Sequence, residues 1–199
     1  MQENYNEQTD IDQLIQNCLK GNQQSYAAIY DLFASGAYRL CYSLLLNSED
    51  AEDVMQESFV YAFKNIHRYD SSRASFKTWL YTIAVSRCRN VYRKRKFHLV
   101  DISQILPSNL ATSPSEGPEA YTAYSHAIET IQQALVELSP RLREAIVLRY
   151  GQGLTYREIA EIMACPQKTA ESRVRLGQEK LKQVLSPVGK SILEELLSY

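Results

Sequence analysis

The stretch "LTYREIAEIMACPQKTAESRVRLGQEKL", residues 154–181, decides the fold of the C-terminal part of the chain. Thr155 with Glu158 three residues later is a capping box, which starts a helix. Apolar residues at helical spacing mark the inner face of this helix: Ile159, Ala160, Ile162 and Met163. The residues "ACPQ" interrupt the pattern, and a further helix then buries Ala170, Val174, Gly177 and Leu181. A short helix, a tight break and a longer basic helix are typical of a helix-turn-helix.

The residues just before this stretch predict one more helix of the same domain. Ser139 followed by Pro140 is an N-cap with proline at the first helical position. The helix would run through Leu142, Ala145, Ile146 and Leu148 and end at Gly151 and Gly153. A three-helix core without any DNA-binding role remains the alternative interpretation of this pattern.

Most of the remaining chain also has helical periodicity. The clearest apolar stripe contains Ala51, Val54, Met55, Phe59, Ala62, Phe63 and Ile66, with Asn47 and Ser48 as cap candidates. Similar stripes run from Ile11 to Leu19, from Tyr26 to Phe33 and from Phe76 to Val91. No run alternates convincingly with period two, so we expect an all-α fold without a sheet.

Helical spacing stops in a segment that is rich in Pro and Ser and has no basic residue. We therefore expect a helical domain over 10–98, a flexible acidic linker over 99–122 and a helix-turn-helix domain over 123–185. The tail 186–199 has an apolar stripe and is expected to pack on the last domain or to meet a partner.

The formal net charge of −1 hides a strong segregation of charge along the chain. Residues 1–66 carry a net −7 and residues 67–100 a net +8, while residues 139–185 carry a net +4. A local basic surface attracts a polyanion whatever the charge elsewhere. Two separate basic segments therefore point to nucleic acid as a partner.

The first basic segment, "KTWLYTIAVSRCRNVYRKRKF" at residues 77–97, mixes cations with aromatic rings. Aromatic faces stack on unpaired bases while Lys and Arg follow the phosphates, so this composition suits single-stranded nucleic acid. Packing in the core is at least as good an explanation for Trp79, because large aromatic residues dominate protein interiors. The sequence favours neither base stacking nor core packing for four other aromatic residues: Tyr69, Phe76, Tyr81 and Tyr92.

Other classes of protein are poorly supported by the composition. The four cysteines stand far apart without metal-ligand spacing, and we interpret them as small core residues. The three histidines have no nucleophile or ligand spacing around them, so we expect neither an enzyme nor a metal or cofactor site. No apolar run approaches membrane-spanning length and no leader is evident, which favours a cytoplasmic protein without membrane insertion.

Two blocks, "DAEDVMQESFVYAFKNIHRYD" with "SFKTWLYTIAVSRCRNVYRKRK" and then "LSPRLREAIVLRYGQGLTYREIAEIMACPQKTAESRVRLGQEKL", resemble the bacterial sigma-70 family of RNA polymerase sigma factors. The resemblance is to the compact extracytoplasmic function (ECF) group, which keeps conserved regions 2 and 4, and it covers roughly residues 10–185. It implies a factor without enzymatic activity that binds core RNA polymerase, recognises the −35 and −10 promoter elements and stabilises the melted −10 strand.

The resemblance also implies roles for individual residues. The exposed face of the acidic helix would bind a coiled coil of the largest polymerase subunit through Asp50, Glu52, Asp53, Gln56 and Glu57; without the resemblance, an ordinary solvated face is the simpler interpretation. Contacts to −10 DNA would come from Tyr69, Ser71, Arg73, Phe76, Lys77, Trp79, Tyr81, Arg87, Arg89, Arg93 and Lys94. Contacts to −35 DNA would come from Thr155, Tyr156, Lys168, Thr169, Glu171, Ser172, Arg173 and Arg175.

The resemblance has departures and further implications. The family commonly has a cation where Glu171 stands and an Arg where Leu176 stands; a glutamate can accept from cytosine N4, so it would contribute selectivity to −35 binding. Other implied partners are the polymerase flap and an anti-sigma factor. A stand-alone helix-turn-helix regulator or a single-stranded nucleic-acid binding module would each explain only one of the two blocks.

Overall fold

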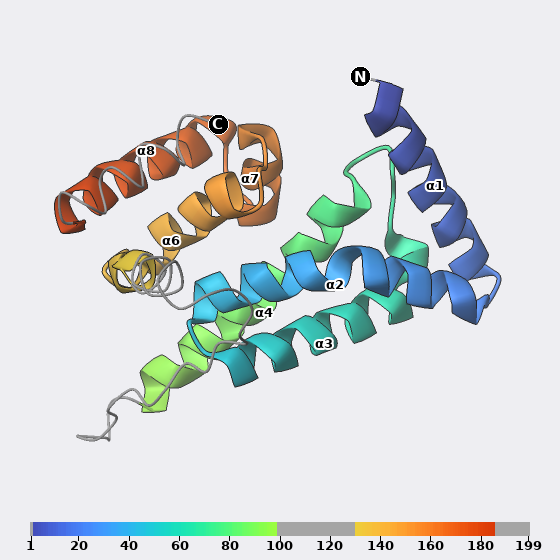
Figure 1. The fold of residues 1–199 in the computed structure, drawn as a ribbon, viewed down its shortest axis with the longest axis horizontal. Coiled ribbons are helices and arrows are strands. Elements are labelled where there is room, and N and C mark those ends of the chain that lie inside the picture. Colours follow the sequence, from blue (N-terminus) through green and yellow to red (C-terminus); the bar gives the residue numbers. More distant parts are fainter. Residues whose placement is uncertain (1, 99–129, 186–199) are drawn as a thin grey trace, which may run out of the picture.

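The computed structural model describes residues 2–98 and 130–185, with side chains over 10–94 and 130–185. The linker expected over 99–122 and the tail over 186–199 lie outside these residues. Every regular element that the structure describes is helical, which confirms the all-α prediction (Figure 1). The helices are α1 (Gln2–Leu19), α2 (Gln23–Leu45), α3 (Ser48–Lys64), the short η1 (Ile66–Arg68), α4 (Phe76–His98), α6 (Pro140–Ile146), the π-helical turn η2 (Val147–Gly151), α7 (Tyr156–Met163) and α8 (Gln167–Val184).

The N-terminal domain is built on α2, α3 and α4, which pack against one another, with α1 at the end farthest from α8 (Figure 1). The turn from α2 to α3 is specified locally: Leu46 adopts a left-handed conformation with φ 54°, and the Asn47 side chain accepts a hydrogen bond from the Asp50 N–H at 2.8 Å. An N-cap of this kind satisfies a donor that the first helical turn leaves free. The apolar stripe of α3 is buried as its periodicity predicted.

The C-terminal domain contains a helical segment at 130–136 followed by α6, η2, α7 and α8. The capping box is formed: the Thr155 hydroxyl accepts from the Glu158 N–H while the Glu158 carboxylate accepts from the Thr155 N–H. Ala164 ends α7 in a left-handed conformation with φ 50°, and α8 begins after Pro166. The buried residues of α8 are those of the predicted face, so the helix-turn-helix prediction is confirmed.

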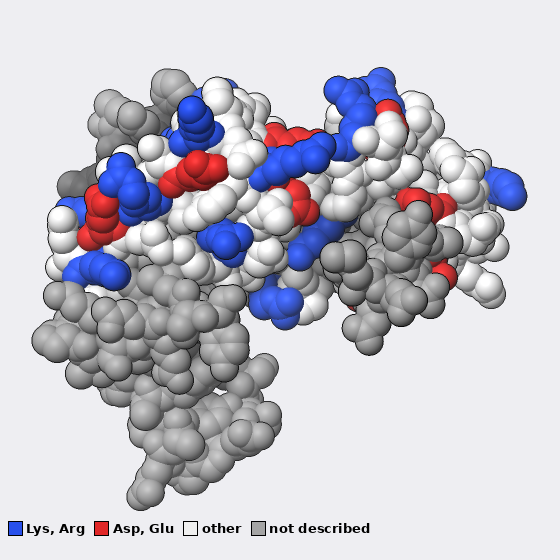
Figure 2. Space-filling view, turned by 90° about the horizontal axis from the view of Figure 1, so that it is seen from above, with Lys and Arg blue, Asp and Glu red and all other residues white. Residues whose placement is uncertain are grey.

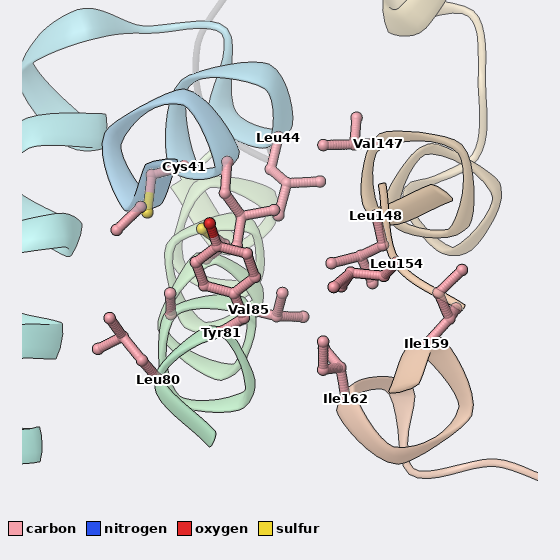
Figure 3. Packing of buried hydrophobic residues seen from close by; sticks show 14 of the residues in the cluster. Cys41, Leu44, Leu80, Tyr81, Val85, Val147, Leu148, Leu154, Ile159 and Ile162 are labelled. Carbon is pink, nitrogen blue, oxygen red and sulfur yellow. The ribbon is translucent and has the colours of Figure 1, made fainter. Parts of the chain in front are cut away.

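The two domains pack directly against each other, which the sequence did not lead us to expect. Helix α4 contacts α7, and α2 contacts η2. Figure 3 shows Leu44 and Val85 of the N-terminal domain pointing toward Leu148 and Leu154 of the C-terminal domain. The buried apolar side chains of both domains form one continuous core. The described part of the chain is therefore a closed assembly of two domains.

Candidate functional site

The exposed side of α3 carries the predicted acidic face. Val54 and Phe59 are turned into the core, while the predicted Glu52, Asp53, Gln56 and Glu57 are exposed and Asp50 is half-buried near the cap. Gln56 Nε2 donates to Glu52 Oε1 at 3.2 Å. Because the apolar stripe holds α3 against the domain, this acidic row faces solvent.

Helix α4 places cations beside this acidic face. Arg87 Nη1 lies 2.7 Å from Glu57 Oε2, and the Arg87 guanidinium lies 5.3 Å from the centre of the Tyr61 ring. Two adjoining surface hollows of about 520 and 500 Å³ share Asp53, Glu57 and Arg87 in their walls. Arg93 and Lys94 line the second hollow. Three cations predicted to contact −10 DNA, Arg87, Arg93 and Lys94, thus lie next to the acidic face of α3.

The loop before α4 presents polar groups above an aromatic cluster. Ser71 and Arg73 are exposed at the loop surface. The Ser72 hydroxyl and N–H both donate to Asp70 Oδ1, at 2.7 and 3.0 Å, and these hydrogen bonds lower the pKa of the Asp70 carboxyl. An Asp that accepts from the backbone two residues on fixes a turn, so the loop has a defined shape.

The aromatic residues around this loop differ in exposure. Phe76 is fully buried, packed against Phe33 at 5.3 Å and against Trp79 at 5.6 Å between ring centres. Its ring has no exposed face on which a base could stack, so the structure gives Phe76 a supporting place beneath the loop. Tyr69 and Trp79 are half-buried and lie 5.5 Å apart. Both residues remain partly accessible to solvent.

The C-terminal domain covers the remaining predicted −10 residues, Lys77, Tyr81 and Arg89. Lys77 Nζ donates to the Gln152 carbonyl at 3.1 Å, and Tyr81 Oη donates to Gln152 Oε1 at 2.9 Å. Burial raises the pKa of Tyr81 to about 12. In this closed arrangement these side chains bind protein groups.

The second predicted surface is formed by α7 and α8. All eight of its predicted residues are exposed or half-exposed. Thr155 caps α7, and the other seven lie at the start of α7 or in the first turns of α8: Tyr156, Lys168, Thr169, Glu171, Ser172, Arg173 and Arg175. Arg149 lies 4.8 Å from the centre of the Tyr156 ring and holds it in place. Figure 2 shows cations on this side of the molecule with acidic groups between them. Two acidic residues of α8 are Glu171, which accepts from Gln167 at 2.9 Å, and Glu179, which pairs with Arg175 at 2.7 Å.

Sequence reasoning missed the charged residues of α6. Arg143 and Glu144 are buried, although charged residues in a helix ordinarily indicate a solvated face. Arg143 donates to backbone carbonyls of Leu135, Val136, Leu138 and Leu44, and Glu144 pairs with Arg89. No local pattern marks them, because Arg143 is enclosed by carbonyls of both domains and Glu144 by Arg89 of the neighbouring domain.

Within the described residues, no group of three or more His, Cys, Asp or Glu side chains could hold a metal ion. None of the helices that the structure describes is long and apolar enough to cross a membrane. The described sites thus consist of an acidic helix face, a loop with a basic helix, and a helix-turn-helix.

Comparison with known proteins relates both domains to one class. Residues 29–98 match the family model of sigma-70 region 2, and residues 128–181 match that of sigma-70 region 4. The ECF RNA polymerase sigma factor SigW of Bacillus subtilis is 33% identical over 191 residues, which cover 88% of this chain and 96% of SigW. The ECF RNA polymerase sigma-E factor of Escherichia coli is 30% identical over 181 residues, covering 88% of this chain and 94% of that protein.

Solved structures have the same fold. The sigma factor RpoE of Bartonella quintana, solved in complex with the anti-sigma factor NepR, aligns with a TM-score of 0.66 at 23% identity over 81% of this chain and 96% of RpoE. CnrH, solved with the cytosolic domain of CnrY, gives a TM-score of 0.65 at 21% identity, covering 86% and 94% of the two chains.

The sequence matches define an RNA polymerase sigma factor, a protein that directs the polymerase to promoters. The chain belongs to the ECF group of the sigma-70 family.

Proposed function

We propose that the acidic face of α3 is the principal anchor for core RNA polymerase, on the coiled coil of the largest subunit. The observation that carries this proposal is the exposed row of Glu52, Asp53, Gln56 and Glu57 on a helix whose other side is fixed in the core. Charges across an interface determine the speed and register of docking. The two hollows beside Asp53 and Glu57 are proposed to receive side chains of the polymerase coiled coil.

Charge reversal tests the anchor. Asp53→Lys with Glu57→Lys should abolish holoenzyme assembly in a pull-down with core polymerase, because both substitutions place repelling charge in the proposed interface. A matched control is Glu137→Lys with Glu161→Lys, which changes the net charge equally at exposed positions of the C-terminal domain. Undiminished binding by the α3 variant, with an unchanged circular dichroism spectrum, would refute the anchor.

The loop from Tyr69 to Ser75 and the exposed part of α4 are proposed to hold the melted −10 strand. Ser71 and Arg73 offer a hydroxyl and a cation at the loop surface, and the half-buried rings of Tyr69 and Trp79 offer faces for stacking. Arg93 and Lys94 are exposed cations toward the end of α4 that suit the strand backbone. Arg87 is proposed to contact the strand next to the polymerase-binding face, since it pairs with Glu57 of that face.

Promoter opening tests the loop. Ser71→Ala with Arg73→Ala should reduce permanganate reactivity of promoter thymines in the holoenzyme while polymerase binding stays unchanged. Phe76 is not substituted, because its loss would remove a core side chain and confound the result. Lys20→Ala, an exposed cation after α1, is the control. Normal opening by the loop variant would exclude this role.

Helix α8 is proposed to enter the major groove of the −35 element. Lys168, Ser172 and Arg175 are exposed along it, and Thr155 and Tyr156 lie at the start of α7. Glu171 and the 45% exposed Leu176 stand where the family commonly has cations, so base selectivity here depends on acceptor and apolar contacts more than on phosphate attraction.

Further partners are proposed from the family. The polymerase flap would hold the C-terminal domain near the −35 element, and catalysis would stay with the polymerase in the cytoplasm. Two proteins of the same fold were solved with the anti-sigma factor NepR or with the cytosolic domain of CnrY, and an anti-sigma factor is proposed as a regulator of this chain as well.

A further inference from the structure

Helix α8 carries an acid on the side that is proposed to face DNA. Glu171 follows the exposed Lys168 by three residues and precedes the exposed Arg175 by four, so the three side chains lie on one face of the helix. Duplex DNA has a negative charge for about every 1.7 Å of its axis, and a carboxylate on this face therefore weakens binding to any sequence. This loss is offset only where the carboxylate meets a hydrogen-bond donor on a base.

A neighbouring side chain holds Glu171 in a defined position. Gln167 Nε2 donates to Glu171 Oε1 at 2.9 Å, across one turn of α8. Glu171 is also half-buried, whereas Gln167 is exposed. A carboxylate accepts at both oxygens, so the bond from Gln167 orients the group while Oε2 keeps its capacity to accept. The second turn of the helix thus presents an acceptor of restricted direction.

The charges around Glu171 balance one another. Arg175 Nη1 lies 2.7 Å from Glu179 Oε1, one further turn along α8. Over residues 168–179 this face thus contains two cations and two acids, with a net charge of zero: Lys168, Glu171, Arg175 and Glu179. A face without net charge has little overall attraction for the DNA backbone. Its contribution to sequence choice must therefore come from contacts to base edges.

The four bases differ in what they offer a carboxylate in the major groove. Cytosine presents the N4 amino group as a donor, guanine presents the acceptors N7 and O6, and thymine presents the acceptor O4. Adenine has a donor at N6 beside an acceptor at N7, which a side-chain amide matches better than a carboxylate does. We infer that Glu171, positioned by Gln167, reads a cytosine of the −35 element through N4. This inference rests on the proposed role of α8 in the major groove, and adds the base and the positioning residue.

Exchanging the side chain at position 171 should exchange the base. The full chain is assembled with core polymerase and offered duplexes that share the −10 element of a promoter it transcribes and carry random bases over the −35 region. Sequencing of the bound duplexes should show cytosine enriched at one position with the wild type, adenine there with Glu171→Gln and guanine with Glu171→Arg, because amide and guanidinium groups pair with those bases. Glu161→Gln removes one exposed acid from α7 and is the matched control, which should keep cytosine.

The N4 amino group itself can be removed to test the contact. Replacing the enriched cytosine by 2-pyrimidinone, which lacks this amino group, should weaken wild-type binding about tenfold more than binding by Glu171→Ala, measured by competition. The difference arises because Glu171→Ala has already lost the acceptor. Equal losses for the two proteins overturn the inference.

Gln167 acts through Glu171, so its substitution should change the choice of base while the fold stays intact by circular dichroism. Gln167→Ala should reduce the preference for cytosine about twofold, and Gln167→Lys, which keeps a donor at this position, should restore it. A wild-type preference in Gln167→Ala excludes the positioning role.

The random duplexes also separate this inference from the proposed function. A wild-type holoenzyme that enriches no sequence over the −35 region would show that α8 does not read this element. Enrichment that is the same for the wild type, Glu171→Gln and Glu171→Arg would leave the role of α8 standing and overturn the reading of cytosine by Glu171.

Discussion

Gly177 of α8 lies against Ile146 of α6 so closely that a methyl group at Gly177 would stand 2.6 Å from Ile146 Cγ1. The two helices approach each other at a point where no side chain fits on α8. This contact fixes the position of the proposed DNA-reading helix on its domain, because α6 is itself held by the core on its other side.

Gly177→Ala is therefore expected to destabilise the protein. Alanine gains about 1 kcal/mol over glycine in helix propensity, but displacing a buried isoleucine costs about 1–3 kcal/mol, and we expect a net loss in the free energy of unfolding in urea. Gly151→Ala is the control, because its methyl group would meet Val147 Cγ1 at an ordinary 3.7 Å. Equal stability of the Gly177 variant and the wild type would contradict the steric argument.

Arg143→Leu should destabilise the protein by about 3 kcal/mol or more, measured by urea unfolding. The guanidinium donates to four backbone carbonyls, and its removal leaves buried acceptors without donors. Arg143→Lys keeps the charge but not the planar fork, so an intermediate loss is expected. The exposed neighbour Arg141→Leu serves as the control and should stay within about 0.5 kcal/mol of the wild type.

Alkaline pH should destabilise the closed protein through two tyrosines. Burial raises the pKa of Tyr81 and of Tyr92 from 10.0 to about 12. Below pH 10 both are protonated in the folded and unfolded chain, so their contribution is fully present. Between pH 10 and 12 the unfolded chain releases these protons while the folded chain keeps them, and stability falls by up to about 1.4 kcal/mol per pH unit for each tyrosine.

Substitution isolates this effect from other groups that titrate at high pH. Tyr81→Phe with Tyr92→Phe should flatten the fall in unfolding free energy between pH 10 and 12. Tyr61→Phe, an exposed tyrosine of α3, is the control. An unchanged pH profile in the double variant would show that the two buried phenols do not cause the loss.

Lys168→Ala should weaken binding of the holoenzyme to promoter duplex in a way that depends on salt. Lys168 is exposed in the first turn of α8 and suits a phosphate contact, and each phosphate contact contributes about 0.9 to the slope of log K against log salt concentration. The slope should decrease by about that amount in filter-binding titrations. Lys20→Ala, a substitution far from α8, should leave the slope unchanged. An unaltered slope for Lys168→Ala would show that Lys168 does not contact a phosphate.

The sequence was sufficient for several features that depend on short-range chemistry, although Ser139 begins α6 without the side-chain cap hydrogen bond expected of an N-cap. The capping box of Thr155 and Glu158, the cap at Asn47 and the buried stripes of α3 and α8 were all predicted, because hydrogen bonds three residues apart and a 3.6-residue period are properties of one helix. The acidic face of α3 follows from the same period, since residues off the stripe must face outward.

Only the tertiary structure decided what covers α4 and α6. Arg89 and Tyr81 had the residue types of a nucleic-acid surface, and Glu144 had the type of a solvated acid, yet all three lie at the boundary between the domains. Arg89 and Glu144 pair across 55 positions of the chain, and Tyr81 pairs with Gln152 across 71 positions. Local patterns cannot encode such a pairing, because the burial of a charge depends on whether a distant opposite charge arrives to compensate it.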